Sequence, residues 1–249
     1  MPDPRDIRKY MKSDGWLEMR GGASDQQRGM PHPLVQRPYP EDAELIDLPA
    51  VDELDLGTMS VHDAIAQRRS RRRFSDVPLA LAELAYLAWA SQGVHRVWRG
   101  GIAIRRTVPS AGSRHPFETY LAVNRVEGLE AGLYRYLSLE HKLLQLRTDP
   151  EIAQKAAKAC HEQAFVAGAA ATFIWTALPY RTEWRYSIMA PKLVCIDAGH
   201  VCGSLYLAAE SIGAGVCAIA AYEQAATDEL LGVNGEEEFA VYVAPVGKV

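Results

Sequence analysis

The stretch from residue 191 to residue 211 has the spacing of one long helix and is apolar around nearly its whole circumference. Val201 and Leu205 lie on one side, whereas Cys202 and Leu207 lie elsewhere around the same helix. A helix that is hydrophobic all round, unlike an amphipathic one, must be buried. The sequence therefore requires a fold that covers this helix on every side, within one core or against a second subunit.

The elements predicted around this helix are mixed in kind and order. Residues 133–137 and 142–146 are separated by a short polar segment and are typical of a hairpin. Further helices are predicted over 81–93, 150–163 and 223–231, and further strands over 118–126, 171–178, 216–222 and 239–246. The segment between residues 93 and 109 is expected to be a loop rich in Arg and Gly. This mixture predicts an α+β fold with a central, mainly antiparallel sheet flanked by helices.

The first part of the chain differs in composition. Seven of the fourteen prolines lie among the first fifty residues, together with Gly21, Gly22 and a polar stretch over 24–28. Proline cannot donate a backbone hydrogen bond, so this part is not expected to form a regular packed layer. We expect residues 1–57 to form an extended, proline-rich arm that lies across the body or a second subunit, or is disordered. Residues 58–249 are expected to form the folded domain.

Composition limits the class of protein. The 249 residues have a formal net charge of -4, with 48% hydrophobic and 23% charged residues, which is ordinary for a globular domain and not basic enough for a dedicated nucleic-acid binder. The longest apolar run, 165–178, is short for a membrane span. The four cysteines show no C-x-x-C spacing and are expected to be reduced and buried. We expect a cytoplasmic protein that binds neither nucleic acid nor membrane.

Five arginines fall between positions 68 and 73, in a chain whose overall charge is slightly negative. They follow a short helix that Ser60 opens with Asp63 three residues later, which is a capping pattern. Guanidinium groups at the end of a helix complement the negative end of its dipole, and their planar forks bind phosphate oxygens in pairs. A phosphorylated small molecule is therefore a candidate ligand. The alternatives are a solvated helix end and a nonspecific polyanion patch.

Two short motifs fail on their context. The G-x-G-x-x-A match at 213–218 lies after a helix and before a strand, which is the reverse of the order in a dinucleotide-binding unit. His161 and Glu162 begin an H-E-x-x-H pattern, but Phe165 occupies the place of the second histidine. The sequence predicts neither a Rossmann site nor a metal site.

Several strings, in their order along the chain, carry a resemblance to a known family. They are R-R-S-x-R at 68–72, P-S-A-G at 109–112 with His115 and Pro116 after it, G-L-Y-R-Y at 132–136, D-A-G-H at 197–200 and P-V-G at 245–247. Over residues 58–249 the chain resembles the FMN-dependent nitroreductase family, and within it the SagB-type branch of thiazoline and oxazoline dehydrogenases. The resemblance implies a nitroreductase-like fold and a homodimer whose flavin sites are each lined by both chains.

The resemblance assigns cofactor-binding roles at four places. The residues that match the R-x-S-x-R motif would hold the FMN phosphate and the pyrimidine edge of the flavin; they are Arg68, Arg69, Ser70 and Arg72. Polar contacts to ring or ribityl atoms would come from the loop Pro109, Ser110, Ala111, Gly112 and Ser113. The backbone amides that face flavin N5 and O4 in the family would belong to Ile219, Ala220 and Ala221. The phosphate pocket would be completed by Lys248.

A catalytic side chain is predicted at one position. In the SagB-type enzymes a Lys-Tyr pair is associated with base chemistry, and this chain has Arg185 and Tyr186 there. Arginine stays protonated, so it can orient an anion but is a poor base. Tyr186 can act as an acid or a base, or line the cleft.

Three functions remain open at this point. The first is an FMN-dependent oxidoreductase that transfers hydride through flavin N5, acting on a small or peptide-derived substrate or reducing nitro and quinone compounds with NAD(P)H. The second is a flavin-binding or flavin-modifying relative without general reductase activity. The third is a non-enzymatic protein that binds a polyanion through the arginine run.

Overall fold

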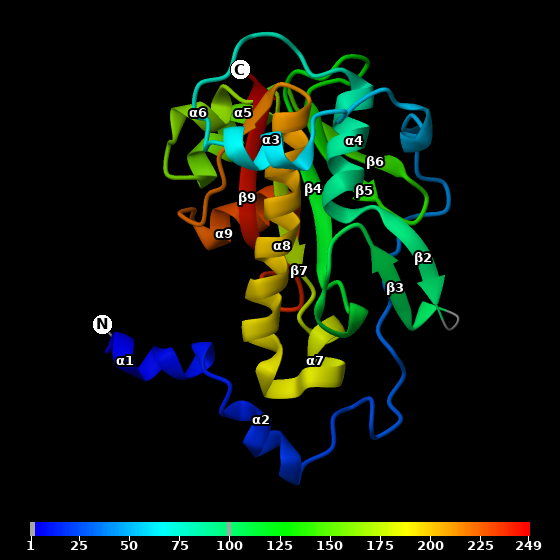
Figure 1. The fold of residues 1–249 in the computed structure, drawn as a ribbon, viewed down its shortest axis with the longest axis vertical. Coiled ribbons are helices and arrows are strands. Elements are labelled where there is room, and N and C mark those ends of the chain that lie inside the picture. Colours follow the sequence, from blue (N-terminus) through cyan, green and yellow to red (C-terminus); the bar gives the residue numbers. More distant parts are fainter. Residues whose placement is uncertain (1–2, 99–100) are drawn as a thin grey trace.

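The computed structural model describes residues 3–98 and 101–249. Within these residues the main sheet has seven strands in the order β1-β6-β5-β4-β7-β9-β8, and neighbouring strands are antiparallel. The strands are β1 (Leu45–Asp47), β4 (Phe117–Val123), β5 (Gly132–Leu137), β6 (Lys142–Thr148), β7 (Ala171–Ala177), β8 (Ala214–Val216) and β9 (Phe239–Lys248). The predicted α+β class with a mainly antiparallel sheet is confirmed (Figure 1).

Helices cover both faces of the sheet (Figure 1). The longer ones are α3 (Val61–Gln67), α4 (Leu81–Gln92), α5 (Ile152–Ala159), α7 (Tyr180–Tyr186), α8 (Ala190–Ser211) and α9 (Gln224–Leu231). Single turns of helix are α1 (Pro4–Ile7), α2 (Gly15–Glu18) and α6 (Ala164–Ala167).

Strand β4 shows how the two faces are filled. Its side chains alternate, so that Leu121 and Val123 join the core beneath α4 and α8, whereas Tyr120 and Ala122 join a second core with α5 and α9. Every residue of β4 is buried, as is every residue of its neighbour β7. These two strands therefore form the centre of a three-layer domain.

The predicted helix 191–211 is confirmed as α8, which runs along the middle of the molecule (Figure 1). Val201 and Leu205 on its inner side are buried. By length and composition alone the region 180–211 could cross a membrane, but it packs here as a core helix. Its outer side is not covered by the described residues of the same chain, and the exposed strip consists of Pro191, Cys195, Ile196, Gly199, His200 and Gly203. The exposure of Cys195 corrects the expectation that all four cysteines are buried.

The segment predicted as an arm makes specific contacts with the body. The amide of Arg37 donates to Glu118 Oε1 at 2.7 Å, and its guanidinium pairs with Glu238 at 2.6 Å. The indole of Trp184 donates to the carbonyl of Met30 at 3.0 Å. Strand β1 pairs with β6 and extends the sheet at one edge. The segment thus contributes an edge strand that its proline content does not predict, and the domain boundary stays a prediction.

Two predictions of secondary structure are wrong. The segment after residue 93, predicted as a loop, forms a separate two-stranded sheet of β2 (Val94–Trp98) and β3 (Ala103–Arg106). There the guanidiniums of Arg96 and Arg105 lie 4.1 and 4.7 Å from the centre of the Trp98 ring, a contact that stabilises the hairpin. Of the strand predicted over 216–222, only Val216 belongs to a strand, as the last residue of β8. Beyond it the chain keeps a single bridge, from Ile219 to Val243.

Candidate functional site

The arginine run begins where α3 ends. Ser60 caps α3 as predicted, by accepting a hydrogen bond from the amide of Asp63 at 3.1 Å. After Gln67 the chain leaves the helix, and Ser70 forms a parallel bridge with Val216 at the edge of the sheet. The run is therefore an extended segment beyond the helix, and not part of its last turn.

Arg71 differs from the other arginines of the run. Successive side chains of an extended segment point to opposite sides. The guanidinium of Arg71 turns to the body and lies 3.3 Å from Glu210 of α8, while its amide donates to the carbonyl of Val216 at 2.9 Å. Its stem packs on Gly215, where a Cβ would overlap it. Arg71 therefore attaches the run to the body.

The remaining arginines keep their charge available. The guanidinium of Arg68 lies over the ring of Tyr206, 5.4 Å from its centre, and that of Arg72 lies 5.8 Å from the centre of the Phe165 ring. In the part of the chain that the structure describes, Arg71 alone of this run forms an ion pair. Several guanidiniums without a carboxylate partner suit a multiply charged anion such as a phosphate.

Tyr206 connects the arginine run to the segment after β8. Its hydroxyl lies 3.1 Å from the hydroxyl of Ser70 and accepts a hydrogen bond from the amide of Ala218 at 2.8 Å. Sequence reasoning missed this residue, because a tyrosine in an apolar helix is more typical of core packing. The contact brings the predicted phosphate-binding residues next to the predicted amide segment 219–221.

The three residues of that segment differ in availability. Ile219 is buried, and its amide donates to the carbonyl of Val243 at 2.7 Å. Ala220 and Ala221 are exposed, and among the described residues their amides have no acceptor. Their small side chains leave the backbone open to close approach. Two of the three predicted amides can thus bind a ligand.

The loop over 109–113 is attached to another part of α8. Pro109 is exposed, whereas the hydroxyl of Ser110 donates to Asp197 Oδ2 at 2.6 Å and the amide of Ala111 lies 3.2 Å from both carboxylate oxygens. Ser110 Oγ also accepts a hydrogen bond from the amide of His115 at 2.9 Å. Burial raises the pKa of Asp197, and the bonds from Ser110 and Ala111 oppose this by stabilising the carboxylate. Sequence reasoning did not single out Asp197 as the residue that holds the loop.

Tyr186 lies against the same loop. Gly112 and Ser113 have positive φ values of 58° and 54°, and a Cβ on Gly112 would overlap the hydroxyl of Tyr186. The ring of Tyr186 is edge-on to Trp16 of α2, with 5.8 Å between centres, and 5.4 Å from the Arg185 guanidinium. The structure therefore brings Tyr186 and the loop together.

The two groups of predicted residues lie on different sides of α8. Asp197 holds the loop and Tyr206 holds the arginine run, and nine positions separate them on one helix. At about 1.5 Å rise and about 3.6 residues per turn, the two attachment points are about 14 Å apart and on opposite sides. One chain therefore does not gather all of these residues around a single pocket.

Lys248 is engaged in a different contact from the one predicted. Its ammonium pairs with Glu83 of α4 and donates to the carbonyl of Ile212 at 3.1 Å. Its backbone lies near the arginine run, where its carbonyl accepts from the amide of Ser75 at 2.8 Å. Because Glu83 neutralises the charge, a role for Lys248 at a phosphate stays a prediction.

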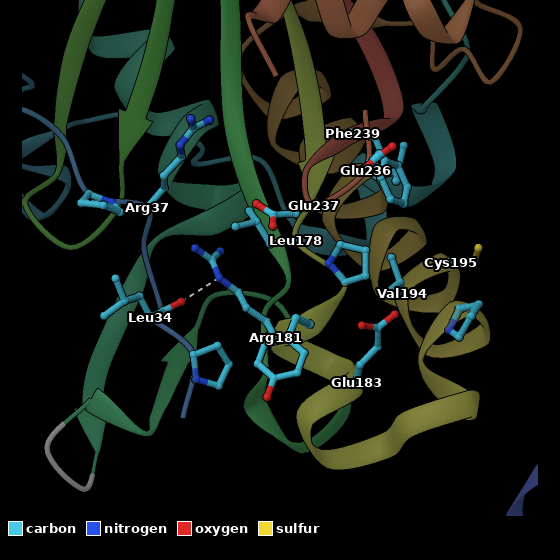
Figure 2. Close-up of a pocket in the computed structure, with 16 residues that line it drawn as sticks. Leu34, Arg37, Leu178, Arg181, Glu183, Val194, Cys195, Glu236, Glu237 and Phe239 are labelled. Carbon is cyan, nitrogen blue, oxygen red and sulfur yellow. Dashed lines mark hydrogen bonds between the residues drawn. The ribbon is translucent and has the colours of Figure 1, made fainter. Parts of the chain in front are cut away.

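A cavity of about 770 Å³ opens beside the N-terminal half of α8 (Figure 2). Its walls come from four segments within 33–38, 178–183, 191–195 and 236–241. Sequence reasoning missed it, because these segments are distant along the chain.

The residues over 65–248 match the nitroreductase family model. The chain belongs to the nitroreductase family. The nitroreductase-family protein MJ1384 of Methanocaldococcus jannaschii is 33% identical over 207 residues, which are 83% of this chain and 98% of that protein. The trifolitoxin-processing protein TfxB of Rhizobium leguminosarum bv. trifolii is 33% identical over 121 residues, which are 45% of this chain and 31% of TfxB.

Solved structures share this nitroreductase fold. A nitroreductase homologue from Anabaena variabilis has a TM-score of 0.76 at 23% identity, over 97% of this chain but only 45% of its own. A chain of the E. coli microcin synthetase McbBCD complex with truncated pro-MccB17 has a TM-score of 0.61 at 16% identity, over 100% of this chain and 98% of that one. The NADPH:FMN oxidoreductase of Vibrio harveyi complexed with NAD+ has a TM-score of 0.53 at 20% identity, over 76% and 68%. At these identities the likeness shows the fold alone, and the fold predicted from the resemblance is confirmed.

Proposed function

We propose that this nitroreductase-family chain binds FMN and is an FMN-dependent oxidoreductase. One observation carries the proposal: Arg68, Arg69 and Arg72 flank Ser70 in the sequence of an extended segment, and in the described structure none of them has a carboxylate partner, although Arg69 donates to the carbonyls of Ala66 and Arg68. The FMN phosphate is a dianion, and hydrogen bonds from arginine to phosphate belong to the strong class. Arg71, which is turned to Glu210, would take no part.

The chain's own residues would bind and orient the cofactor. When bound, FMN supplies the redox chemistry through hydride transfer at N5. Ser70 and the three arginines would hold its phosphate, and the amides of Ala220 and Ala221 would donate to its ring, where fixed donors stabilise negative charge. Tyr206, which contacts both Ser70 and Ala218, would fix the position of the phosphate-binding residues relative to the two amides.

The proposed functional unit is a homodimer. The loop over 109–113 lies on the other side of α8 from the arginine run, so its predicted flavin contacts would be made to the cofactor of a second chain. The exposed strip with Cys195, Gly199 and Gly203 is suited to such pairing, because small residues allow close approach and apolar surface loses contact with water. Pairing there would also complete the cover of α8 that the sequence requires.

The SagB-type branch is proposed for the finer assignment. Partial similarity to TfxB, which is named for trifolitoxin processing, and fold similarity to a microcin synthetase chain support it. The substrate would be a small or peptide-derived molecule, with NAD(P)H as the donor when the flavin must be reduced. The cytoplasm is the proposed location, because the four cysteines are free thiols.

Tyr186 is proposed to exchange a proton with the substrate. The neighbouring guanidinium of Arg185, 5.4 Å from the centre of the Tyr186 ring, would not accept a proton itself, because arginine is a poor base. Tyr186→Phe should leave flavin content unchanged but lower kcat for NADH-driven quinone reduction by about tenfold or more and alter its pH profile. A variant with the parental pH profile would assign Tyr186 to the cleft lining only.

The decisive experiment for the cofactor is the visible spectrum of the purified protein. A yellow protein that releases FMN on denaturation would support the proposal, and rapid bleaching by NADH or NADPH would separate an oxidoreductase from a flavin-binding or flavin-modifying relative. A colourless protein that cannot be reconstituted with FMN would contradict the proposal and leave polyanion binding as the use of the arginine run.

A further inference from the structure

We propose that the cavity beside α8 binds a small molecule with an apolar body and a cationic group, as the substrate of the proposed oxidoreductase. Its volume of about 770 Å³ lies within the range of about 300 to 1,000 Å³ that is usual for small-molecule sites. Leu34, Val194 and Phe239 are among the apolar side chains that form most of its walls (Figure 2). Such walls suit an aromatic or aliphatic body.

Both arginines of the cavity walls are already neutralised. Arg181 is buried, pairs with Glu118 at 2.5 Å and donates through Nε to the carbonyl of Leu34 at 2.8 Å (Figure 2). Arg37 pairs with Glu238 at 2.6 Å, and Figure 2 shows its guanidinium pointing away from the cavity. Neither arginine therefore offers its charge to an anionic ligand.

The acidic side chains of the walls are not neutralised in this way. Glu183, Glu236 and Glu237 line the cavity, and within the described residues none of them forms an ion pair. Glu183 rises from α7 toward Val194 (Figure 2); burial raises its pKa, and a cationic group placed beside it would oppose that shift by stabilising the carboxylate. The charge that a ligand meets is thus negative, which attracts a protonated amine or a guanidinium and repels a carboxylate or phosphate.

The cavity and the segment proposed to face the flavin ring both adjoin strand β9. The hydroxyl of Tyr222 donates to the carbonyl of Ala240 at 3.0 Å, and the neighbours of Ala240, Phe239 and Val241, line the cavity. Tyr222 directly follows Ala221, whose amide is free among the described residues. Side chains alternate along β9, so Tyr222 and Ala240 lie on the α9 side of this strand and Phe239 and Val241 lie on its α8 side. One strand thus separates a molecule in the cavity from the segment of the proposed redox centre, and the assignment of that molecule as the substrate rests on the proposed function.

The test compares three ligands with one aromatic body: phenethylamine, phenethyl alcohol and phenylpropionate. Binding is measured by calorimetry on the full-length protein as purified, with flavin content measured in the same samples. We expect the amine to bind about three- to fivefold more tightly than the alcohol, the carboxylate to bind most weakly, and the amine's preference to shrink at high salt. Glu183→Gln should remove most of that preference and leave the alcohol unchanged. Glu229→Gln, the same charge change on α9, is the control and should bind like the parent.

Equal binding of the three ligands, or an unchanged preference in Glu183→Gln, would overturn the proposal. Selective binding of a lysine-containing peptide without binding of the free amine would overturn the small-molecule assignment. These outcomes are separable from a failure of the proposed function: absence of FMN counts against the oxidoreductase, whereas loss of charge preference in a flavin-loaded protein counts only against the cavity assignment.

Discussion

The hydroxyl groups of Ser70 and Tyr206 lie 3.1 Å apart, and the tyrosine oxygen also accepts a hydrogen bond from the amide of Ala218 at 2.8 Å. One atom of α8 therefore joins the arginine run to the segment that carries the free amides of Ala220 and Ala221. A ligand held at both places depends on this link even where it does not touch the hydroxyl. Tyr206 is in this sense a positioning residue.

Tyr206→Phe tests the link directly. The substitution keeps the ring beneath Arg68 and removes only the oxygen. A lost hydrogen bond of this kind costs about 0.5–1.5 kcal/mol, so FMN affinity should fall by about three- to tenfold. Fluorescence titration of FMN measures the change, and Tyr206→Ala, which also removes the ring, should bind more weakly still. Parental affinity in Tyr206→Phe would show that the link does not position the site.

The arginine run offers a matched pair of variants. Arg68→Ala with Arg72→Ala should weaken FMN binding at least tenfold, because charge-assisted hydrogen bonds contribute about 1.5–3 kcal/mol each. Riboflavin, which lacks the phosphate, should bind equally to parent and variant. Arg71→Ala is the control: it breaks the pair with Glu210 and should lower thermal stability while leaving FMN affinity nearly unchanged. If the double variant retains FMN as well as the parent, the phosphate lies elsewhere.

The exposed strip of α8 predicts how the dimer can be broken. Beyond the backbone of its own helix, a Cβ on Gly203 meets no described atom within 4 Å, so Gly203→Glu should not disturb the fold and should even favour the helix by about 0.5–1 kcal/mol. We expect a chain with an unchanged or raised Tm that is monomeric by light scattering and has lost FMN. Gln154→Glu adds the same charge on α5 and should stay dimeric. A dimeric, flavin-loaded Gly203→Glu would rule out α8 as the interface.

Local patterns predicted the fold where they were strong. The helix at α8, the hairpin of β5 and β6 and the cap at Ser60 follow from periodicity and capping residues that act over a few positions. The strand predicted over 216–222 was wrong because strand pairing depends on a distant partner: β8 pairs with β9 only over Val246–Lys248, and after β8 the chain keeps a single bridge to Val243. The β2–β3 hairpin was missed because an arginine-rich segment is more typical of an exposed loop. In the structure the guanidiniums of two of these arginines lie over the ring of Trp98.

The candidate site was predictable as residue types and not as an arrangement. The sequence shows five arginines within six positions, but only the pairing partner Glu210 distinguishes Arg71 from the others. Likewise, the sequence shows Asp197 and Tyr206 only as polar residues in an apolar helix. Their contacts, with Ser110 and with Ala218, come from segments that pack against opposite sides of α8. Tertiary contacts decide these assignments, and no local pattern encodes them.

His115 links the loop over 109–113 to the stability of the protein at low pH. Its amide donates to Ser110 Oγ, and its side chain is buried. Burial, with the charge of Arg106 adding to it, lowers the pKa of His115 from 6.5 to about 3. The unfolded chain therefore binds more protons than the folded chain between these two values. The free energy of unfolding should fall as pH drops below about 6.5, by up to about 1.4 kcal/mol per pH unit.

His115→Gln isolates this contribution, because glutamine does not titrate. Urea denaturation of parent and variant between about pH 7 and pH 5, above the range in which most carboxylates titrate, should show a steeper loss of unfolding free energy in the parent. Burial also lowers the pKa of His141, so a smaller slope of the same sign should remain in both proteins. Parallel pH curves would show that the imidazole of His115 gains protons equally in the folded and unfolded chains, and would contradict its burial beside Arg106. A steeper parental curve would show that the folded chain keeps the imidazole of His115 neutral, at the position where the amide of the same residue bonds Ser110 beside Asp197.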